Sequence, residues 1–158
     1  MDENAASFDI LEIALRLGAA VVVGVVIGIN RDLTKKPIGM RTLGLVSLGA
    51  AVVSLSTIHF EGLANHPDAL SRVVQGIIQG IMAGIGFIGA GVILRDVKSQ
   101  TVQGLTTAAT VWVTAALGIA CGLAAWTIVG LSVALALFLL VGLGWIEGVL
   151  EREREKPR

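Results

Sequence analysis

The longest uncharged segment of the chain runs from Ser99 to Ile146 and has no Lys, Arg, Asp, Glu or His in 48 residues. A helix that crosses the hydrocarbon core of a bilayer needs about 20 consecutive apolar residues. The segment is therefore long enough to cross twice. The whole chain has a matching composition, with 54% hydrophobic residues and a mean hydropathy of +0.83. These values exclude an ordinary soluble domain and indicate that the chain lies in a lipid bilayer.

Five membrane-spanning helices are predicted, at residues 10–29, 42–58, 73–94, 105–123 and 126–146. We therefore expect an all-α membrane protein built as a bundle of five transmembrane helices. Residues 1–150 form its transmembrane domain and residues 151–158 a short charged cytoplasmic tail, and we expect no second, soluble domain. Glu12 and Arg16 fall inside the first span, one turn apart and opposite in charge. They are either an ion pair that reaches the outer interface or a functional pair.

The positive charges predict the orientation of the bundle. Ten of the twelve Lys and Arg residues fall in the loops after spans one and three and in the C-terminal tail. Short cation-rich loops stay on the cytoplasmic side. We therefore expect the N-terminus outside and the C-terminus in the cytoplasm. The N-terminus begins with acidic residues rather than the positive charge of a cleavable signal, so we expect span one to be retained.

Residues 84–89, GIGFIG, match the G-x-G-x-x-G fingerprint of a dinucleotide-binding turn. That turn follows a strand, and an acidic residue comes about 20 positions later. Here the preceding residues continue an apolar helix, and the first acidic residue after Asp96 is Glu147. We therefore expect no nucleotide. Nucleic acid is not expected either, because no basic patch with interleaved aromatic residues is present.

The glycines fit close packing between membrane helices, where small residues let two backbones approach each other. Three of them repeat at every fourth position in span three, and pairs with the same spacing occur in spans one and four. This spacing serves contacts within one chain and contacts in an oligomer equally well. The predicted packing residues are Gly24, Gly28, Gly76, Gly80, Gly84, Gly86, Gly89, Gly91, Gly118 and Gly122.

Polar residues at the predicted cytoplasmic ends of the helices form the candidate site. The pair Arg-Asp occurs at residues 31–32 and again at 95–96. Topology explains arginine there but not aspartate, so the two acids are the more informative members. Threonines on one face of span four either line a polar crevice or bond to neighbouring helices and their own backbone. The candidate set is Asn30, Arg31, Asp32, Arg41, Arg95, Asp96, Thr106, Thr107, Thr110 and Trp112.

We expect no catalytic residues, no metal and no cofactor. The predicted spans have no nucleophile–base pair, zinc-type histidine motif or paired carboxylates. His59, Glu61, His66 and Asp68 are metal-capable types in the outer loop, but their loose spacing is typical of solvated loop residues. Cys121 stands alone in an apolar span, where we expect a small buried packing residue.

Two long motifs resemble the signature of the MgtC/SapB family of bacterial inner-membrane proteins. They are GFIGAGVILRD at residues 86–96 and VQGLTTAATVWVTAALG at residues 102–118. Upstream, GVVIGINRD and GMRTLGLVSLGAA also resemble the family, so the resemblance extends from Leu15 to Leu143. Family members often have Glu where Asn30 stands here. Several also have a soluble, ACT-like C-terminal domain, which we do not expect in this chain because it ends at Arg158.

The resemblance implies a multi-pass protein of the bacterial inner membrane, linked to growth under magnesium limitation, acid or host stress and, in pathogens, to virulence. Family members are thought to contact other membrane proteins, including ATP synthase and transport or sensor proteins, rather than to catalyse a reaction. We therefore predict a non-enzymatic regulatory protein that binds itself or a membrane-protein partner. The alternative is a small oligomeric transporter or channel for a cation such as magnesium. Against it, spans two to five have no ionisable residue near their centres.

Overall fold

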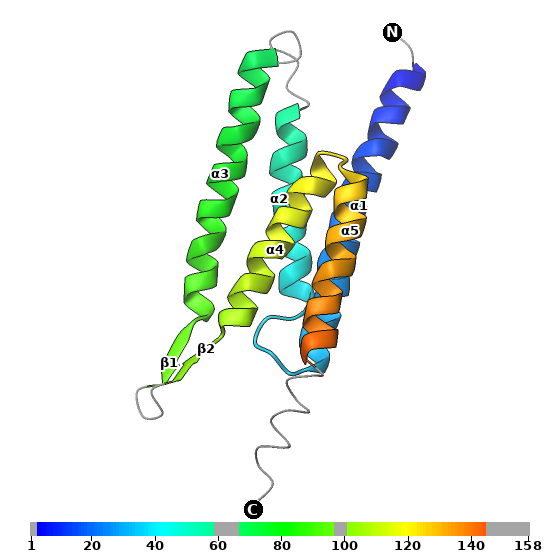
Figure 1. Ribbon diagram of the computed structural model, residues 1–158. Coiled ribbons are helices and arrows are strands. Elements are labelled where there is room, and N and C mark those ends of the chain that lie inside the picture. Colours follow the sequence, from blue (N-terminus) through cyan, green and yellow to red (C-terminus); the bar gives the residue numbers. More distant parts are fainter. Residues whose placement is uncertain (1–2, 59–66, 97–100, 145–158) are drawn as a thin grey trace, which may run out of the picture.

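A computed structural model describes residues 3–58, 67–96 and 101–144, which form a bundle of helices (Figure 1). The helices are α1 (Glu3–Leu33), α2 (Met40–Ile58), α3 (Pro67–Val92), α4 (Leu105–Gly122) and α5 (Trp126–Leu137), and α5 continues into the π-helix η1 (Phe138–Leu143). Five segments are long and apolar enough to cross a membrane: Ile10–Leu33, Met40–Ile58, Asp68–Val92, Leu105–Gly122 and Trp126–Leu143. The prediction of five such helices is confirmed, while their orientation in the membrane stays a prediction.

The main departure from the predicted elements lies between α3 and α4. We expected span three to run to residue 94, but α3 ends at Val92, and Leu94–Asp96 forms strand β1. It pairs antiparallel with β2 (Thr101–Gln103), so that Leu94 lies opposite Gln103 and Asp96 opposite Thr101. The apolar residues before Arg95 contain no turn signal, so the sequence predicts a helix that continues up to this arginine. Arg95 and Asp96 lie on a hairpin rather than at a helix end.

The core of the bundle lies around α4. More than half of this helix is buried, against about a tenth of α3 and less of α5. Its fully buried side chains include Val111, Ala115 and Cys121, which agrees with the packing role expected for the cysteine. Helix α2 packs against both α1 and α4, and Leu43 and Ala51 are its fully buried apolar residues. The core thus consists mainly of small and branched side chains, which allow the helices to approach closely.

Glycines on α1 and α4 make the closest approaches to α2. A Cβ atom on Gly24 would lie 2.4 Å from the carbonyl oxygen of Leu43, and one on Gly118 would lie 2.2 Å from that of Ser47. Gly28 and Gly122 meet the backbone of α2 in the same way, at Met40 and Ala51. Real Cβ atoms essentially never come this close to another atom. These four positions therefore admit only glycine unless the helices move apart.

The glycines of α3 are placed differently. A Cβ atom on Gly76, Gly80 or Gly84 would meet nothing within 4 Å, and the same holds at Gly86 and Gly91. Only Gly89 of this helix has a neighbour, the Cβ atom of Ala108 at 3.6 Å. Within the described part of the chain, the regular glycine stripe of α3 therefore faces no other helix, unlike the glycines of α1 and α4.

The outer surface of the bundle is apolar enough to contact lipid. Phe87 on α3 is 85% exposed, and Leu45 on α2 is 69% exposed. Large exposed side chains also line α5 and η1, including Leu131 and Phe138. Exposed apolar area of this extent would not be stable in water, whereas in a bilayer it faces hydrocarbon.

The segments that contain the candidate site gather at one end of the bundle (Figure 1). The end of α1, the start of α2, the β1–β2 hairpin and the start of α4 all lie there, opposite the start of α1 and the turn between α4 and α5. Of the described cations, all but Arg16 and Arg72 belong to these segments or to the loop between α1 and α2. The predicted cytoplasmic residues therefore share one end of the molecule.

Candidate functional site

A hydrogen bond between two helices forms the centre of the site. Arg31, in the last turn of α1, donates through Nη2 to Oγ1 of Thr107, in the first turn of α4. Both side chains are buried, with 3% of each residue exposed. The Nε of Arg31 is also buried and has no hydrogen-bond acceptor. A buried guanidinium of this kind usually pairs with a carboxylate, because a neutral hydroxyl offsets little of the cost of removing the charge from water.

No such carboxylate is found among the described side chains. Their one ion pair joins Glu12 to Arg16 at the opposite end of α1. Asp32 follows Arg31 in sequence, but its carboxylate is engaged elsewhere. The positive charge of Arg31 is therefore offset within the described part of the chain only by the Thr107 hydroxyl and the carbonyl end of α1.

Asp32 caps the start of α2. Its Oδ2 accepts a hydrogen bond from the backbone N–H of Met40 at 2.9 Å. The preceding residue, Gly39, leaves room for this carboxylate, because a Cβ atom there would lie 1.7 Å from Oδ1 of Asp32 and would displace it. The positive-inside rule gave no reason for an aspartate at this position. In the structure, Asp32 satisfies one of the free amides at a helix N-terminus. Sequence reasoning missed this role because the aspartate belongs to α1 and not to the usual position just before α2.

The start of α4 is fixed by a glycine that provides no side-chain cap. Gly104 has a φ of +89°, which other residues rarely adopt, and a Cβ atom there would lie 2.2 Å from the carbonyl oxygen of Val92. The carbonyl of Gly104 accepts a hydrogen bond from Ala108 N at 2.9 Å, but a glycine has no side chain that could bond to the amides of the first turn. Thr106 in this turn is exposed. The amide end of α4 therefore adds positive partial charge near Arg31.

The other threonines of α4 bond to their own helix. Oγ1 of Thr110 donates to the carbonyl of Thr106 at 2.7 Å, and Oγ1 of Thr114 donates to that of Thr110 at 2.8 Å. Both residues are buried. For these threonines, the sequence left open a polar crevice, or bonds to neighbouring helices and their own backbone. The bonds in the structure are of the second kind, to their own backbone at Thr110 and Thr114 and to another helix at Thr107.

The remaining candidates are more scattered. Asn30 is partly buried, and Arg41 is exposed at the start of α2. Trp112 is half exposed. Arg95 lies opposite Val102 in the hairpin and Asp96 opposite Thr101, and their side chains lie outside the described part of the structure. Among the described residues of the set, Arg31 and Thr107 are the pair that bond side chain to side chain.

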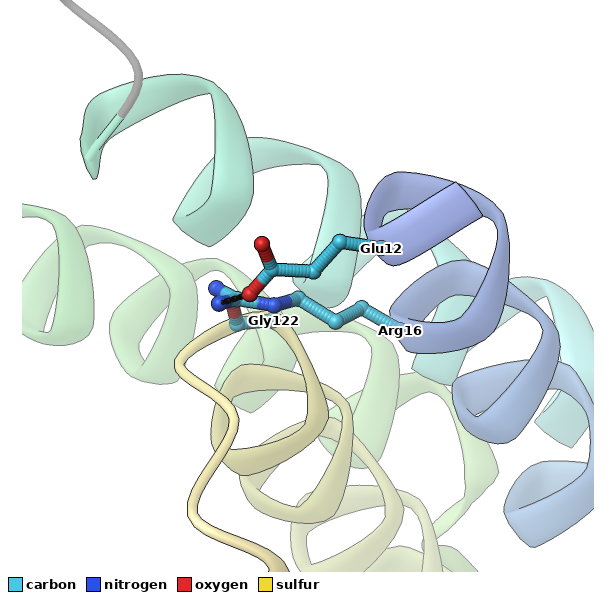
Figure 2. A network of polar contacts seen from close by, with 3 residues as sticks. All are labelled: Glu12, Arg16 and Gly122. Carbon is cyan, nitrogen blue, oxygen red and sulfur yellow. Dashed lines mark hydrogen bonds and ion pairs between the residues drawn. The ribbon is translucent and has the colours of Figure 1, made fainter. Parts of the chain in front are cut away.

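A second arginine joins the same two helices at the other end of the bundle. Figure 2 shows Arg16 between Glu12 and the last turn of α4. Its Nη1 donates to the carbonyl oxygen of Gly122 at 3.0 Å, and its Nη2 pairs with the carboxylate of Glu12. The side chain of Arg16 is 12% exposed, against 41% for Glu12. The ion pair is confirmed, and the cap on the C-terminus of α4 is an additional role that spacing along α1 could not reveal.

Other ligand-binding features are sparse in the part of the chain that the structure describes. No group of three or more His, Cys, Asp or Glu residues gathers there. His59, Glu61 and His66 of the outer loop lie outside the described residues, as does the tail at 151–158. A shallow groove of about 670 Å³ runs along α3, lined by Leu70, Ser71, Val74, Gln75, Ile78 and Gln79.

Residues 17–149, which include every element from the middle of α1 to η1, match the MgtC family. The chain belongs to the MgtC family. It is 48% identical to Protein SrpB of Synechococcus elongatus in an alignment 125 residues long that covers 73% of this chain and 66% of SrpB. It is 42% identical to Protein MgtC of Salmonella typhimurium over 69% of this chain and 42% of that protein, and 37% identical to Protein SapB of Bacillus subtilis over 70% and 47%.

This MgtC-family chain thus spans about two thirds of SrpB and less than half of MgtC and SapB. Every candidate residue from Asn30 to Trp112 falls inside the matched region. No solved structure is significantly similar to the chain. The membership agrees with the resemblance seen in the glycine-rich motif of α3 and the threonine-rich motif of α4.

Proposed function

We propose that this chain is a non-enzymatic regulatory protein of the bacterial inner membrane that acts by binding another membrane protein, or a second copy of itself, through α3. The observation that supports the proposal is the glycine stripe Gly76, Gly80 and Gly84, which meets no atom of the described residues within 4 Å. In lipid, helices associate through close backbone packing and interhelical hydrogen bonds, and such stripes are typical of their interfaces. An unoccupied stripe on a membrane helix favours a contact outside the chain.

Two glutamines on a neighbouring face of α3 support the same proposal. Gln75 and Gln79 are exposed and line the groove along this helix. An amide that faces hydrocarbon loses its hydrogen bonds to water, and a second helix with a polar group would restore them. Interhelical bonds of this kind contribute on average about 0.6 kcal/mol each, so close backbone packing would supply most of the affinity.

The kind of regulation is proposed from the family. Resemblance to the MgtC/SapB family supports a role in adaptation to low magnesium, acid or host stress, and the positive-inside rule supports an outside N-terminus and a cytoplasmic C-terminus. Because the relatives are considerably longer than the matched region, their full activity is carried over here only as part of this proposal.

Photo-cross-linking in native membranes tests the α3 contact. A photoreactive amino acid at position 80 is expected to give an adduct with a second membrane protein or a second copy of the chain. The matched control is position 49 on α2, where glycine also has nothing within 4 Å but does not belong to a three-glycine stripe. Equal labelling at both positions, or none at position 80, would contradict the proposal.

The transporter alternative makes a different prediction. A glycine-rich helix can form an ion path by breaking and exposing its carbonyl groups, but α3 is continuous from Pro67 to Val92. Purified protein in liposomes separates the two functions. Magnesium flux that exceeds the flux through Asp32→Ala and Asp96→Ala variants would replace the regulatory proposal with a transport function.

A further inference from the structure

Arg31 is a buried cation with an unpaired N–H donor. A guanidinium has five N–H donors, and Arg31 makes one described hydrogen bond, from Nη2 to Thr107. Its Nε is buried without an acceptor, and only 3% of the residue is exposed to solvent. An unpaired donor on a buried charge is costly, so a site of this kind is expected to hold an acceptor with negative charge.

The surroundings of Arg31 strengthen the positive field. The first turn of α4 points its free amides toward this end of the bundle, and Gly104 supplies no side chain to cap them. Lys35, Lys36 and Arg41 are exposed in the neighbouring loop and at the start of α2. Asp32 is the one acid among residues 30–41, and it is bound to Met40 N. The carbonyl end of α1 offsets part of this charge but adds no full negative charge.

We propose that Arg31 and the first turn of α4 bind a phosphate group, presented either by an anionic phospholipid or by a soluble phosphate. Four cations and one acid within residues 30–41 favour an anion with several oxygens over a single carboxylate. The planar guanidinium offers two parallel donors that match phosphate oxygens, and amides at a helix N-terminus bind the same group.

The position of the site suits a lipid headgroup. Arg31 lies two residues before the end of the candidate span Ile10–Leu33, and Thr107 two residues after the start of Leu105–Gly122. The ends of membrane-spanning helices generally lie near the interface, where a bilayer has its phosphates. Basic residues at the cytoplasmic ends of membrane helices commonly contact such headgroups. The site is separate from the glycine stripe on α3, so its test does not depend on the proposed regulatory contact.

The test measures binding to the full chain in a neutral detergent. The ligands are short-chain phosphatidylglycerol, phosphatidylcholine of the same chain length, inorganic phosphate, and acetate as the carboxylate control, all at constant ionic strength. A ligand that binds the folded state raises the unfolding midpoint in a concentration-dependent way, which gives its affinity. Arg31→Gln removes the charge, Arg31→Lys keeps the charge without the planar fork, and Lys36→Gln is the matched control at an exposed cation.

Arg31→Gln is expected to weaken phosphate-group binding about tenfold or more, with Arg31→Lys intermediate and Lys36→Gln within about twofold of the original protein. Arg31-dependent binding of phosphatidylglycerol alone identifies a lipid site, and equal Arg31-dependent binding of inorganic phosphate identifies a soluble ligand. If Arg31→Gln does not fold, the affinity of Arg31→Lys for the phosphate ligands decides whether Arg31 binds them. Affinity unchanged in Arg31→Lys, an equal loss in Lys36→Gln, or tighter binding of acetate than of phosphate overturns the proposal.

Discussion

Arg16 donates to the carbonyl oxygen of Gly122 at 3.0 Å, and this contact fixes the end of α4 against α1. Fifteen residues further along α1, Arg31 bonds to Thr107, which lies fifteen residues before Gly122 on α4. The two helices run antiparallel, so equal spacing brings both pairs into register about 22 Å apart. Two arginines on one helix therefore hold both ends of the most deeply buried helix of the bundle.

Removal of the Arg16 cap is expected to destabilise the bundle. Arg16→Met keeps much of the side-chain volume but loses the bond to Gly122, and hydrogen bonds to charged groups contribute about 1.5–3 kcal/mol. Titration with a denaturing detergent, followed by helix content, measures the loss in the free energy of unfolding. Glu12→Gln is the control, because Glu12 is 41% exposed and its ion pair should contribute less than about 1 kcal/mol. A larger loss for Glu12→Gln than for Arg16→Met would contradict this account of the contact.

The glycine contacts between α4 and α2 can be tested with one methyl group. Gly118→Ala would place a Cβ atom 2.2 Å from the carbonyl of Ser47, and we expect the bundle to lose about 1–3 kcal/mol through overpacking. Gly49→Ala on α2 meets nothing within 4 Å and should be neutral or slightly stabilising, because alanine favours helix over glycine. Thermal unfolding of both variants in the same detergent measures the difference. Equal midpoints would show that α2 and α4 do not pack in this way.

The cap at α2 predicts coupling between two residues in different segments. Asp32→Ala removes the acceptor for Met40 N and should cost about 0.5–2 kcal/mol, whereas Asp32→Asn keeps an oxygen at that position and should cost less. Gly39→Ala should clash with the Asp32 carboxylate and lose much of its effect in the Asp32→Ala background. Additive losses in the double variant would be inconsistent with the direct contact between these residues.

The bundle could be predicted because its determinants are local. Long uncharged runs define the five helices, and the cation-rich loops indicate which helix ends lie together. The partners of polar groups were harder to predict, since Arg16 bonds to a carbonyl 106 positions away and Asp32 caps a helix that begins eight residues later. Periodicity along one helix shows which residues share a face but not which element packs on that face.

The glycines illustrate this limit most clearly. Gly24 and Gly28 on α1 have the same spacing as Gly80 and Gly84 on α3. The first pair lies against the backbone of α2, whereas the second meets no atom within 4 Å in the part of the chain that the structure describes. Spacing alone does not separate a contact inside the bundle from a surface that is open to a partner. The hairpin at β1 and β2 was also missed, because Ile93 and Leu94 continue the apolar run of α3 without a turn signal.

The most direct measurement is photo-cross-linking from position 76 on α3 in native membranes, with and without a bulky side chain further along the same stripe. Gly84→Leu should abolish the adduct, because it fills the stripe on which the partner packs, while Gly49→Leu should leave the adduct unchanged. Both positions are open among the described residues, so neither substitution should unfold the bundle. An adduct that persists in Gly84→Leu, with the same partner and yield, would contradict the claim that α3 binds its partner through this stripe.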